Sequence, residues 1–375
     1  MSTIRIVLAG AGSGGHLFPL VTVAKKIKEQ LQNEDRGAQI IFIGPKGKME
    51  EKIMNENQIP QKNILCGKLR RYFSLAYFSD AIKFPIGIIQ SLWHLFWFMP
   101  DVVFAKGGFA SVPVVISAKI LFIPVVIHES DAMPGLANKF LGAIADKIAI
   151  NFERAVIYFP PHKTFLSGIP VKEEAINGSK EKARAFLGMH KEVKPVVLFL
   201  GGSQGAKAIN DKILFNIDAL IKKYQIVHQI GEKNFEKVSK EVERKGYKIS
   251  HSDYYPLGFV GKEIGDIYAL ADVIVSRAGA TNIAEIGANG KPAIFVPIKK
   301  GANDHQRINA YEVARVNAGF VLEEDNFSLH LLNHFIDEIL TKEDLRIKIS
   351  QNIQKFFYYP DANEKIADEV LLFCK

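Results

Sequence analysis

The stretch VLAGAGSGGHLFP, Val7 to Pro19, gives the clearest indication of the fold class, because it joins a predicted strand to a predicted helix through a glycine-rich turn. The run that leads into it, Ile4–Ala9, is apolar and rich in β-branched residues, as are strands of parallel sheets that are covered on both faces. The stretch PVVLFLGGSQGA, from Pro195, repeats this pattern. The sequence therefore predicts an α/β protein with two Rossmann-like halves. The helix after the first turn has one apolar face, which consists of Leu20, Val23, Ala24, Ile27 and Leu31.

Apolar runs alternate with amphipathic stretches along the chain, which predicts two doubly wound parallel-sheet domains, as the length of 375 residues also favours. The segment FPPHKTFLSGIPVKEE, Phe159 to Glu174, has no clear period and is predicted to connect them. We expect an N-terminal domain over residues 1–167, a C-terminal domain over 168–360, and a last helix at about 361–375 that packs back on the first domain. The predicted strands are Ile4–Ala9, Gln39–Gly44, Asp101–Ala105, Pro124–His128, Ile148–Asn151, Pro195–Leu200, Gln225–Ile230, Asp272–Ser276 and Ala293–Pro297.

Composition narrows the class of protein. With 48% hydrophobic and 23% charged residues, the chain has the composition of a folded globular protein. The two cysteines, Cys66 and Cys374, lie in no spacing typical of a disulfide framework or a zinc site, which favours a reducing cytoplasm. No signal peptide is visible at the N-terminus. The net charge of +8 favours an anionic partner such as nucleic acid, a phosphorylated substrate or an acidic bilayer, although it also serves solubility alone.

The first glycine turn contains G-x-G-x-x-G, which raises the question of a nicotinamide dinucleotide. In that fingerprint the second strand ends in an acidic residue that holds the ribose hydroxyls. Here the second strand ends at Gly44, and Asp35 lies before the strand, so the dehydrogenase interpretation loses its main support. The turn keeps its capacity to bind an anion at the start of a helix. His16, at that helix start, has either a structural or a catalytic role.

A set of motifs in a fixed order carries a resemblance to a known family: GAGSGGHLFPL, KGGFASVPVV, HESDAMPGLANK, GGSQGA, VHQIG, SRAGATNIAEI and NDHQRINA. Over nearly the whole chain, the sequence resembles the MurG family of GT-B glycosyltransferases, in which two Rossmann-like domains face a cleft. The resemblance implies an inverting transferase that moves GlcNAc from UDP-GlcNAc to the MurNAc 4-hydroxyl of undecaprenyl-diphosphate-linked MurNAc-peptide (lipid I) in peptidoglycan synthesis. The alternatives are another GT-B enzyme, such as a UDP-GlcNAc 2-epimerase or a diacylglycerol glycosyltransferase, and a basic membrane scaffold without activity.

The resemblance implies that the donor, UDP-GlcNAc, binds mainly in the second domain. The turn GGSQGA would contact the diphosphate, Glu285 the ribose hydroxyls, and His305 the donor sugar. From the residues alone, the turn also suits an ordinary strand-to-helix connection, and Glu285 also suits a helix start. Lys172 stands where the family often has Arg. The implied donor-binding residues are Ser13, Gly14, Gly15, Lys172, Ser203, Gln204, Gly205, Phe259, Val260, Arg277, Gly279, Ala280, Thr281, Glu285, His305 and Gln306.

The first domain is expected to take the lipid-linked acceptor. His16 is the first candidate for the base that removes the proton of the acceptor hydroxyl, and Asp131 and Glu129 are the reserve candidates. Asp131 stands where the family often has Asn, so its role is open. The implied acceptor-binding residues are Gly12, Gly107, Gly108, His128, Asp131 and Asn138.

The segment from residue 67 to residue 101 points to a membrane surface. Its apolar part, Pro85–Met99, has 15 residues and is too short to span a bilayer. The part before it interleaves bases with aromatic rings, which suits anionic headgroups, although the rings also suit a core and the bases a solvated face. These residues are Lys68, Arg70, Arg71, Tyr72, Phe73, Tyr77, Phe78, Lys83 and Phe84.

Partners and location follow from these patterns. We expect UDP-GlcNAc, the undecaprenyl-linked acceptor, an anionic membrane surface and other cell-wall synthesis proteins as partners. Nucleic acid is not expected, because no recognised binding module is present. The expected location is peripheral, on the cytoplasmic face of the plasma membrane. No cofactor or bound metal is expected, since no D-x-D pair follows a strand where it would hold a cation against the diphosphate.

Overall fold

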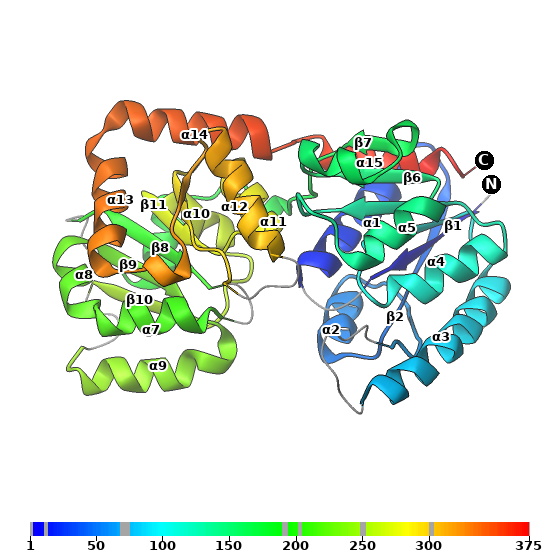
Figure 1. The fold of residues 1–375 in the computed structure, drawn as a ribbon, viewed down its shortest axis with the longest axis horizontal. Coiled ribbons are helices and arrows are strands. Elements are labelled where there is room, and N and C mark those ends of the chain that lie inside the picture. The colour runs from blue at the N-terminus through cyan, green and yellow to red at the C-terminus, as the bar shows by residue number, and fades with distance from the viewer. Residues whose placement is uncertain are drawn as a thin grey trace. The chain divides into compact units, whose positions relative to one another are not determined.

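The chain forms two compact units, each with one parallel sheet between layers of helices (Figure 1). The structure is a computed structural model, and it describes residues 3–10, 14–67, 76–189, 194–201, 205–247, 253–299 and 304–374, without the side chains of 76–79. Unit 1 comprises Met1–Pro170 and Tyr359–Lys375, and unit 2 comprises Val171–Tyr358. The expected fold class of two Rossmann-like parallel-sheet domains is confirmed.

Unit 1 contains a seven-stranded parallel sheet in the order β3-β2-β1-β4-β5-β6-β7. Its strands are β1 Thr3–Ala9, β2 Gly37–Gly44, β3 Gln61–Asn63, β4 Val102–Ala105, β5 Val125–Glu129, β6 Lys147–Ile150 and β7 Thr164–Leu166. Its α-helices are α1 Gly14–Asn33, α2 Lys48–Glu56, α3 Ala76–Phe98, α4 Ser111–Ile120, α5 Leu136–Ile144 and α15 Ala362–Leu371. Three short 3₁₀ turns also occur, η1 Glu153–Tyr158 and η2 Pro161–Lys163 in unit 1, and η3 Glu173–Ala175 at the start of unit 2.

Two hydrophobic cores cover the two faces of this sheet, because successive residues of a strand point to opposite faces. Along β1, Ile6 and Leu8 enter one core, and Val7 and Ala9 enter the other. The first core includes the apolar face of α1 and, from the far end of the sequence, Ile366 on α15. The C-terminal helix therefore packs against α1 in unit 1.

Unit 2 contains a six-stranded parallel sheet in the order β10-β9-β8-β11-β12-β13. Its strands are β8 Val196–Leu200, β9 Gln225–Gln229, β10 Tyr254–Leu257, β11 Val273–Ser276, β12 Ala293–Phe295 and β13 Phe320–Val321. Its α-helices are α6 Lys180–Leu187, α7 Lys207–Phe215, α8 Ile217–Lys223, α9 Glu232–Arg244, α10 Ile264–Leu270, α11 Ala280–Ala288, α12 His305–Arg315, α13 Leu329–Thr341 and α14 Glu343–Phe357, with a 3₁₀ turn η5 at Glu324–Asn326.

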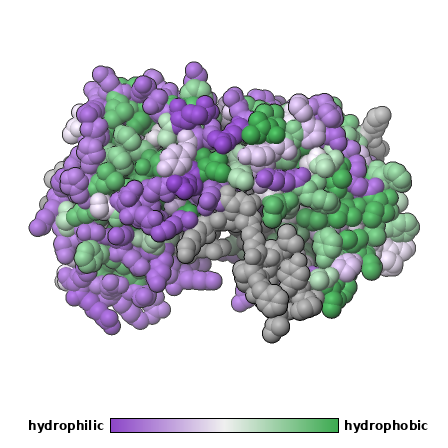
Figure 2. Space-filling view, viewed as in Figure 1, coloured by the Kyte–Doolittle hydropathy of each residue, from purple (hydrophilic) through white to green (hydrophobic). Residues whose placement is uncertain are grey.

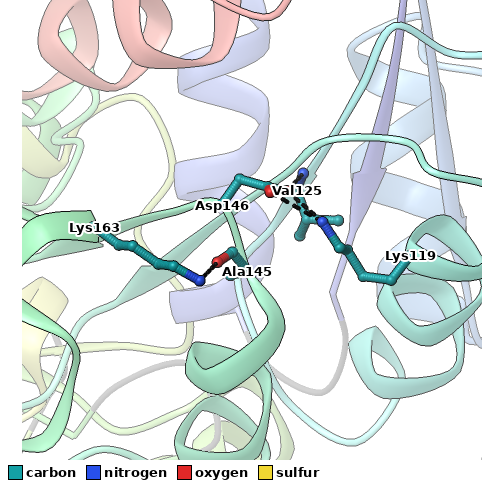
Figure 3. A network of polar contacts seen from close by, with 5 residues as sticks. All are labelled: Lys119, Val125, Ala145, Asp146 and Lys163. Carbon is teal, nitrogen blue, oxygen red and sulfur yellow. Dashed lines mark hydrogen bonds and ion pairs between the residues drawn. The ribbon is translucent and has the colours of Figure 1, made fainter.

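The amino edges of the strands are fixed by side-chain contacts to the backbone. In unit 1, the Asp146 carboxylate accepts the amide N–H of Val125 (2.8 Å) and binds the Lys119 ammonium (2.9 Å), while Lys163 donates to the Ala145 carbonyl (2.9 Å; Figure 3). These contacts join β5, α4 and the start of β6 at the edge of the sheet away from the first glycine turn. None of these contacts involves the carboxyl edge of the sheet.

Four strands were not expected from the sequence, and each lies at the edge of a sheet: β3, β7, β10 and β13. One expectation is corrected here. The segment Phe159 to Glu174 was predicted to be only a connection, but Thr164–Leu166 within it pairs in parallel with β6 and completes the first sheet. The division into units falls after Pro170, a few residues beyond the end of this strand.

Candidate functional site

Each sheet has one point at which the direction of strand order reverses, between β1 and β4 in unit 1 and between β8 and β11 in unit 2. In open parallel sheets, ligands bind outside the carboxyl ends of the strands at this point. In unit 1, the ends of β1 and β4 lie side by side there, and the Lys106 N–H donates to the Ala9 carbonyl. In unit 2, the ends of β8 and β11, which Gly201 and Arg277 follow, lie side by side in the same way.

Lys106 is a buried cation at the carboxyl edge of unit 1, and the sequence patterns did not select it. Its side chain is 1% exposed, its ammonium donates to the Ser130 hydroxyl, and it feels the charges of Glu129 and Asp131. Burial lowers the pKa of Lys106, while the two neighbouring carboxylates oppose that shift. A Lys that directly follows a buried strand and precedes two glycines was the available sequence signal.

Glu129 anchors the loop that follows β5. Its carboxylate accepts the amide N–H groups of Asp131 (2.8 Å) and Gly135 (3.3 Å) and the side-chain amide of Asn138 (2.9 Å). It is 4% exposed, and burial together with the Asp131 charge raises its pKa. Gly107 packs against Asn138 with a φ of +87°, and a Cβ there would lie 2.4 Å from the amide oxygen of Asn138. These contacts indicate that Glu129 and Asn138 shape the loop.

His128 lies inside unit 1. It is fully buried, its Nε2 lies 3.0 Å from the Gly168 carbonyl oxygen, and burial and the Lys106 charge hold its pKa well below the usual range. We expected His128 among the acceptor-binding residues. Its burial favours a supporting role beneath the edge, because a side chain with no exposed surface does not reach a ligand without movement of the chain around it.

His16 and Asp131, the other candidates for the base, are half-buried rather than enclosed. His16 lies in the first turn of α1, after β1, and Asp131 lies in the loop after β5. Both follow strands at their carboxyl ends, on the same edge of the sheet as Lys106. The His16 charge contributes to the low pKa of His128.

Glu285 lies on α11, the helix that follows the central strand β11 of unit 2. Its Oε2 accepts the hydroxyl hydrogen of Tyr268, at 2.8 Å. Burial raises the pKa of Glu285, while the Tyr268 hydrogen bond and the Lys172 charge oppose that shift. Glu285 lies beyond the first turn of α11, which starts at Ala280. The expectation that it complements a helix start is therefore corrected, since that effect falls off within the first turn.

Arg277, an expected donor-binding residue, contacts other groups of unit 2. The sequence suggested a donor-binding role, but its guanidinium is engaged within unit 2, with Nη2 2.5 Å from the Glu324 carboxylate and Nη1 donating to the Val296 carbonyl (3.0 Å). Only 8% of Arg277 is exposed. The contacts indicate that it joins the end of β12 to the 3₁₀ turn η5.

The other expected donor residues follow strand ends in unit 2. Gly205 has a φ of +74° and packs against the Ile230 carbonyl, which follows β9. Phe259 is half-exposed after β10, whereas Val260 beside it is buried, as a core residue would be. Gly279 precedes α11, which begins with Ala280 and Thr281.

The remaining predictions divide into three groups. His305 and Gln306 are half-buried at the start of α12, and Lys172 is half-buried at the start of unit 2. Gly14, Gly15 and Gly108 lie next to the strand ends of unit 1. Gly12, Ser13, Ser203 and Gln204 lie outside the described residues. Within the ranges that the structure describes, no cluster of three or more His, Cys, Asp or Glu side chains is placed to hold a metal ion.

Helix α3 presents an apolar face to solvent, which the sequence did not distinguish from a core. Six side chains at helical spacing on α3, 36 to 66% exposed, form what we call the α3 face: Ile82, Ile86, Ile89, Trp93, Phe96 and Trp97. Figure 2 shows apolar side chains gathered over the part of unit 1 that α3 and α4 form. The expected rings and bases from Lys68 to Phe73 lie outside the described residues, and Lys83 pairs with Asp80 at 3.6 Å. Among the helices described, none has the length and apolarity needed to cross a bilayer.

Comparisons with known proteins agree with this architecture. Residues 6–150 match the glycosyltransferase family 28 N-terminal domain, and residues 196–363 match the glycosyltransferase family 28 C-terminal domain. The fold and the two domains thus define a two-domain glycosyltransferase. A relative from Clostridium novyi is 36% identical over 93% of this chain and 94% of its own length, and one from Bacillus thuringiensis (strain Al Hakam) is 38% identical over 89% and 91%. The chain belongs to their family, the UDP-N-acetylglucosamine–N-acetylmuramyl-(pentapeptide) pyrophosphoryl-undecaprenol N-acetylglucosamine transferases.

Solved structures show the same fold. The Acinetobacter baumannii MurG structure aligns over 98% of this chain and 99% of its own, with a TM-score of 0.74 and 23% identity. A UDP-GlcNAc 2-epimerase from Neisseria meningitidis, bound to UDP-GlcNAc, aligns over 99% and 100% with a TM-score of 0.67 and 13% identity. Because both identities are low, these likenesses show the fold and do not separate a transferase from an epimerase. The sequence relatives make that distinction.

Proposed function

We propose that this enzyme transfers N-acetylglucosamine from UDP-GlcNAc to the MurNAc 4-hydroxyl of undecaprenyl-diphosphate-linked MurNAc-peptide, with inversion at the anomeric carbon. The observation that carries the proposal is the identity of 36 to 38% to relatives named for this transfer, over about nine-tenths of both chains. In the reaction, the acceptor oxygen forms a bond to the anomeric carbon as the bond from that carbon to the UDP oxygen breaks. The acceptor proton passes to a base, and UDP leaves with the bonding electrons.

The donor site of the proposal lies at the carboxyl edge of unit 2. There Glu285 accepts hydrogen bonds from the ribose hydroxyls, for which its carboxylate has free acceptor capacity besides the bond from Tyr268. The turn after β8 and the start of α11 offer N–H groups to the diphosphate. The likeness of the fold to an epimerase bound to UDP-GlcNAc supports a nucleotide sugar as the ligand class.

The base of the proposal is His16, with Asp131 in reserve. His16 is half-buried at the reversal point of the unit 1 sheet, where a ligand at the carboxyl edge would meet it. Glu129 is the weakest of the three candidates, because its carboxylate already accepts three N–H groups and is almost fully enclosed. Lys106 supports the edge by supplying a positive charge next to Glu129 and Asp131.

Release of UDP tests the proposed reaction. The full-length enzyme is given UDP-GlcNAc with and without the lipid-linked acceptor, in detergent. A transferase releases UDP only with the acceptor and forms the disaccharide lipid. Conversion of the donor alone to its 2-epimer would instead identify an epimerase, and the absence of any product in both arms would identify a scaffold.

For location, we propose peripheral binding to an anionic membrane on its cytoplasmic face. The α3 face supplies exposed rings, and the bases between Lys68 and Lys83 supply charge. Trp93 and Trp97 pack edge to face with ring centroids 5.6 Å apart, so they offer one continuous apolar surface. Contact with other cell-wall synthesis proteins is part of the same proposal for this face of unit 1.

Changing Trp93 and Trp97 together to Ser should weaken binding to anionic vesicles about tenfold or more, because binding scales with the apolar area that enters the interface. Changing Arg70 and Arg71 together to Glu should weaken it most at low salt. Phe215→Ser is the matched control, since Phe215 is an exposed ring (81%) in unit 2. Cosedimentation measures binding, and turnover of a short-chain soluble acceptor should stay nearly unchanged. Unaltered sedimentation of both double variants would reject the membrane proposal.

A further inference from the structure

Tyr268 is a buried residue at the donor edge that neither the sequence motifs nor the proposed reaction uses. It lies on α10, is 1% exposed, and donates its hydroxyl hydrogen to Oε2 of Glu285. The two residues belong to different helices on either side of β11. The hydrogen bond therefore depends on the fold, and the sequence spacing of the two residues gives no hint of it.

Helix α10 is held at both ends, so the Tyr268 hydroxyl has a fixed position. Near its start, the Asp266 carboxylate accepts the amide N–H of Ser179, at 2.7 Å. At its end, the Lys291 ammonium donates to the carbonyl groups of Ala269 (2.8 Å) and Ala271 (2.9 Å). Tyr268 lies between these two attachments.

Glu285 is fixed through its backbone as well as through its side chain. The side-chain amide of Asn289 donates to the carbonyl group of Glu285 (2.8 Å) and to that of Ala175 (2.7 Å). This ties α11 to the segment that carries Lys172, whose charge also favours the ionised form of Glu285. A carboxylate has about four acceptor positions, and the hydroxyl of Tyr268 occupies one of them.

The hydroxyl of Tyr268 is the donor in its bond to Glu285. Burial and the Glu285 charge raise its pKa well above the usual range, so it stays protonated at neutral pH. A carboxylate that receives this bond stays ionised more readily and keeps one orientation. The orientation leaves the second oxygen for two adjacent hydroxyl groups of a ligand.

We infer that Tyr268 is a positioning residue for the donor nucleotide, which aims the Glu285 carboxylate at the two hydroxyl groups of the ribose. This inference rests on the proposed assignment of Glu285 to the ribose. It extends the donor site to a residue that touches no substrate and acts only through Glu285. The opposing view is that the hydroxyl merely satisfies a buried donor and carboxylate, in which case its removal changes stability alone.

A combined change in protein and ligand separates these views. Calorimetry of the full-length chain measures the affinity for UDP and for 2′,3′-dideoxy-UDP, which lacks both ribose hydroxyls. Tyr268→Phe should weaken UDP about tenfold, as expected for loss of a hydrogen bond to a charged group, and should change the affinity for dideoxy-UDP less than about twofold. The UDP defect should grow as the pH is lowered from 8 to 5.5, because Glu285 without its donor takes up a proton at higher pH.

Two further variants keep the outcomes apart. Tyr254→Phe is the matched control, because Tyr254 is a buried tyrosine of the same unit whose hydroxyl contacts His228, and it should leave both affinities within about twofold. Glu285→Ala tests the ribose assignment itself. If Glu285→Ala weakens UDP while Tyr268→Phe does not, or if Tyr268→Phe weakens both nucleotides equally, the positioning role is wrong. If Glu285→Ala leaves UDP binding unchanged, the proposed donor site is wrong as well.

Discussion

The two sheets have the same strand order around the reversal point, but the side chains at their carboxyl edges differ in chemical character. In unit 1, a buried ammonium, a buried carboxylate and a buried imidazole lie together, as Lys106, Glu129 and His128. In unit 2, the carboxylates are engaged by fixed donors, Glu285 by Tyr268 and Glu324 by Arg277. The first edge has a buried cation beside two carboxylates, and the second has carboxylates that a tyrosine hydroxyl and a guanidinium hold in place.

This difference suggests how one fold serves two tasks. The strand order determines where a ligand binds, because the carboxyl ends of the central strands lie side by side at the reversal point in both units. The residues in those loops determine what is done there. The unit 1 edge carries the half-buried His16 and Asp131, the candidates for the base, whereas fixed donors and acceptors such as those of unit 2 suit recognition of a nucleotide. We expect variants to separate accordingly: changes in unit 1 should affect turnover, and changes in unit 2 should affect UDP affinity.

The largest effect is expected for His16→Ala. Loss of a general base should lower kcat about 10²- to 10⁴-fold and leave UDP affinity nearly unchanged, because the ribose contact proposed for Glu285 lies in unit 2. Steady-state turnover of a soluble acceptor and calorimetry with UDP measure the two quantities. Asp131→Asn is the companion variant. If it abolishes turnover while His16→Ala keeps more than about a tenth of the wild-type rate, Asp131 is the base and the assignment of His16 is wrong.

Lys106→Met tests the buried charges of unit 1. Removing the ammonium takes away the donor to the Ser130 hydroxyl and the positive charge near the enclosed Glu129, which should destabilise the unit by about 1 to 3 kcal/mol. Denaturant unfolding measures this cost. The matched control is Lys119→Met at the amino edge of the same sheet, where the pair with Asp146 is one-third exposed and should contribute about 0 to 1 kcal/mol (Figure 3).

A double variant sharpens this test. Combining Lys106→Met with Glu129→Gln removes both charges, so its cost should be smaller than the sum of the two single costs. Additive costs would mean that Lys106 stabilises unit 1 through its packing, independently of Glu129.

The nine predicted strands correspond to the central strands of the two sheets, because those strands are buried on both faces and read as continuous apolar runs. The missed strands lie at the edges, where one side is unpaired and two to four residues suffice. In β10, Pro256 argues against a strand and is tolerated because an edge strand has one free side. Such short edge strands are set by the neighbouring strand, so their own sequences carry little signal.

At the candidate site, the sequence found the loops but not the contacts between distant residues. The glycine turns and Glu285 follow from local patterns and from the family resemblance. Tyr268 could not be assigned, since its partner lies on another helix. The exposure of Trp93 and Trp97 could not be predicted either, because the apolar pattern of α3 fits a buried helix equally well.

A smaller effect is expected from the buried histidine of unit 2. His228 lies 3.0 Å from both the Tyr254 hydroxyl and the Asn210 amide oxygen, and burial lowers its pKa to about 3. The Asn210 amide nitrogen donates to the Ile230 carbonyl, so its oxygen faces the ring and His228 donates from Nε2. The surroundings of His228 fit a neutral imidazole ring and do not fit a protonated one.

The sign of the pH dependence follows from the lowered pKa. The unfolded chain binds a proton at His228 below about pH 6.5 and the folded chain does not, so stability is fully present above that pH and is lost as the pH falls. Between pH 6.5 and 5 this group should cost unit 2 about 2 kcal/mol, and His228→Gln should remove that loss. Denaturant unfolding of the wild type and of the variant at both pH values measures this loss. An equal acid loss in wild type and variant would show that His228 is not the group responsible.

The smallest effect is expected from metal removal. If the second edge works through fixed donors, the diphosphate charge is balanced by N–H groups after β8 and at the start of α11, and turnover in excess EDTA should change less than about twofold. Within the described residues, no cluster of His, Cys, Asp or Glu side chains is arranged to supply a cation instead. Initial rates with EDTA, followed by addition of Mg²⁺ or Mn²⁺, make the measurement. If turnover is lost completely and either ion restores it, a cation stabilises the leaving group. The donor edge of unit 2 would then not work through protein groups alone, and its contrast with the edge of unit 1 would no longer hold.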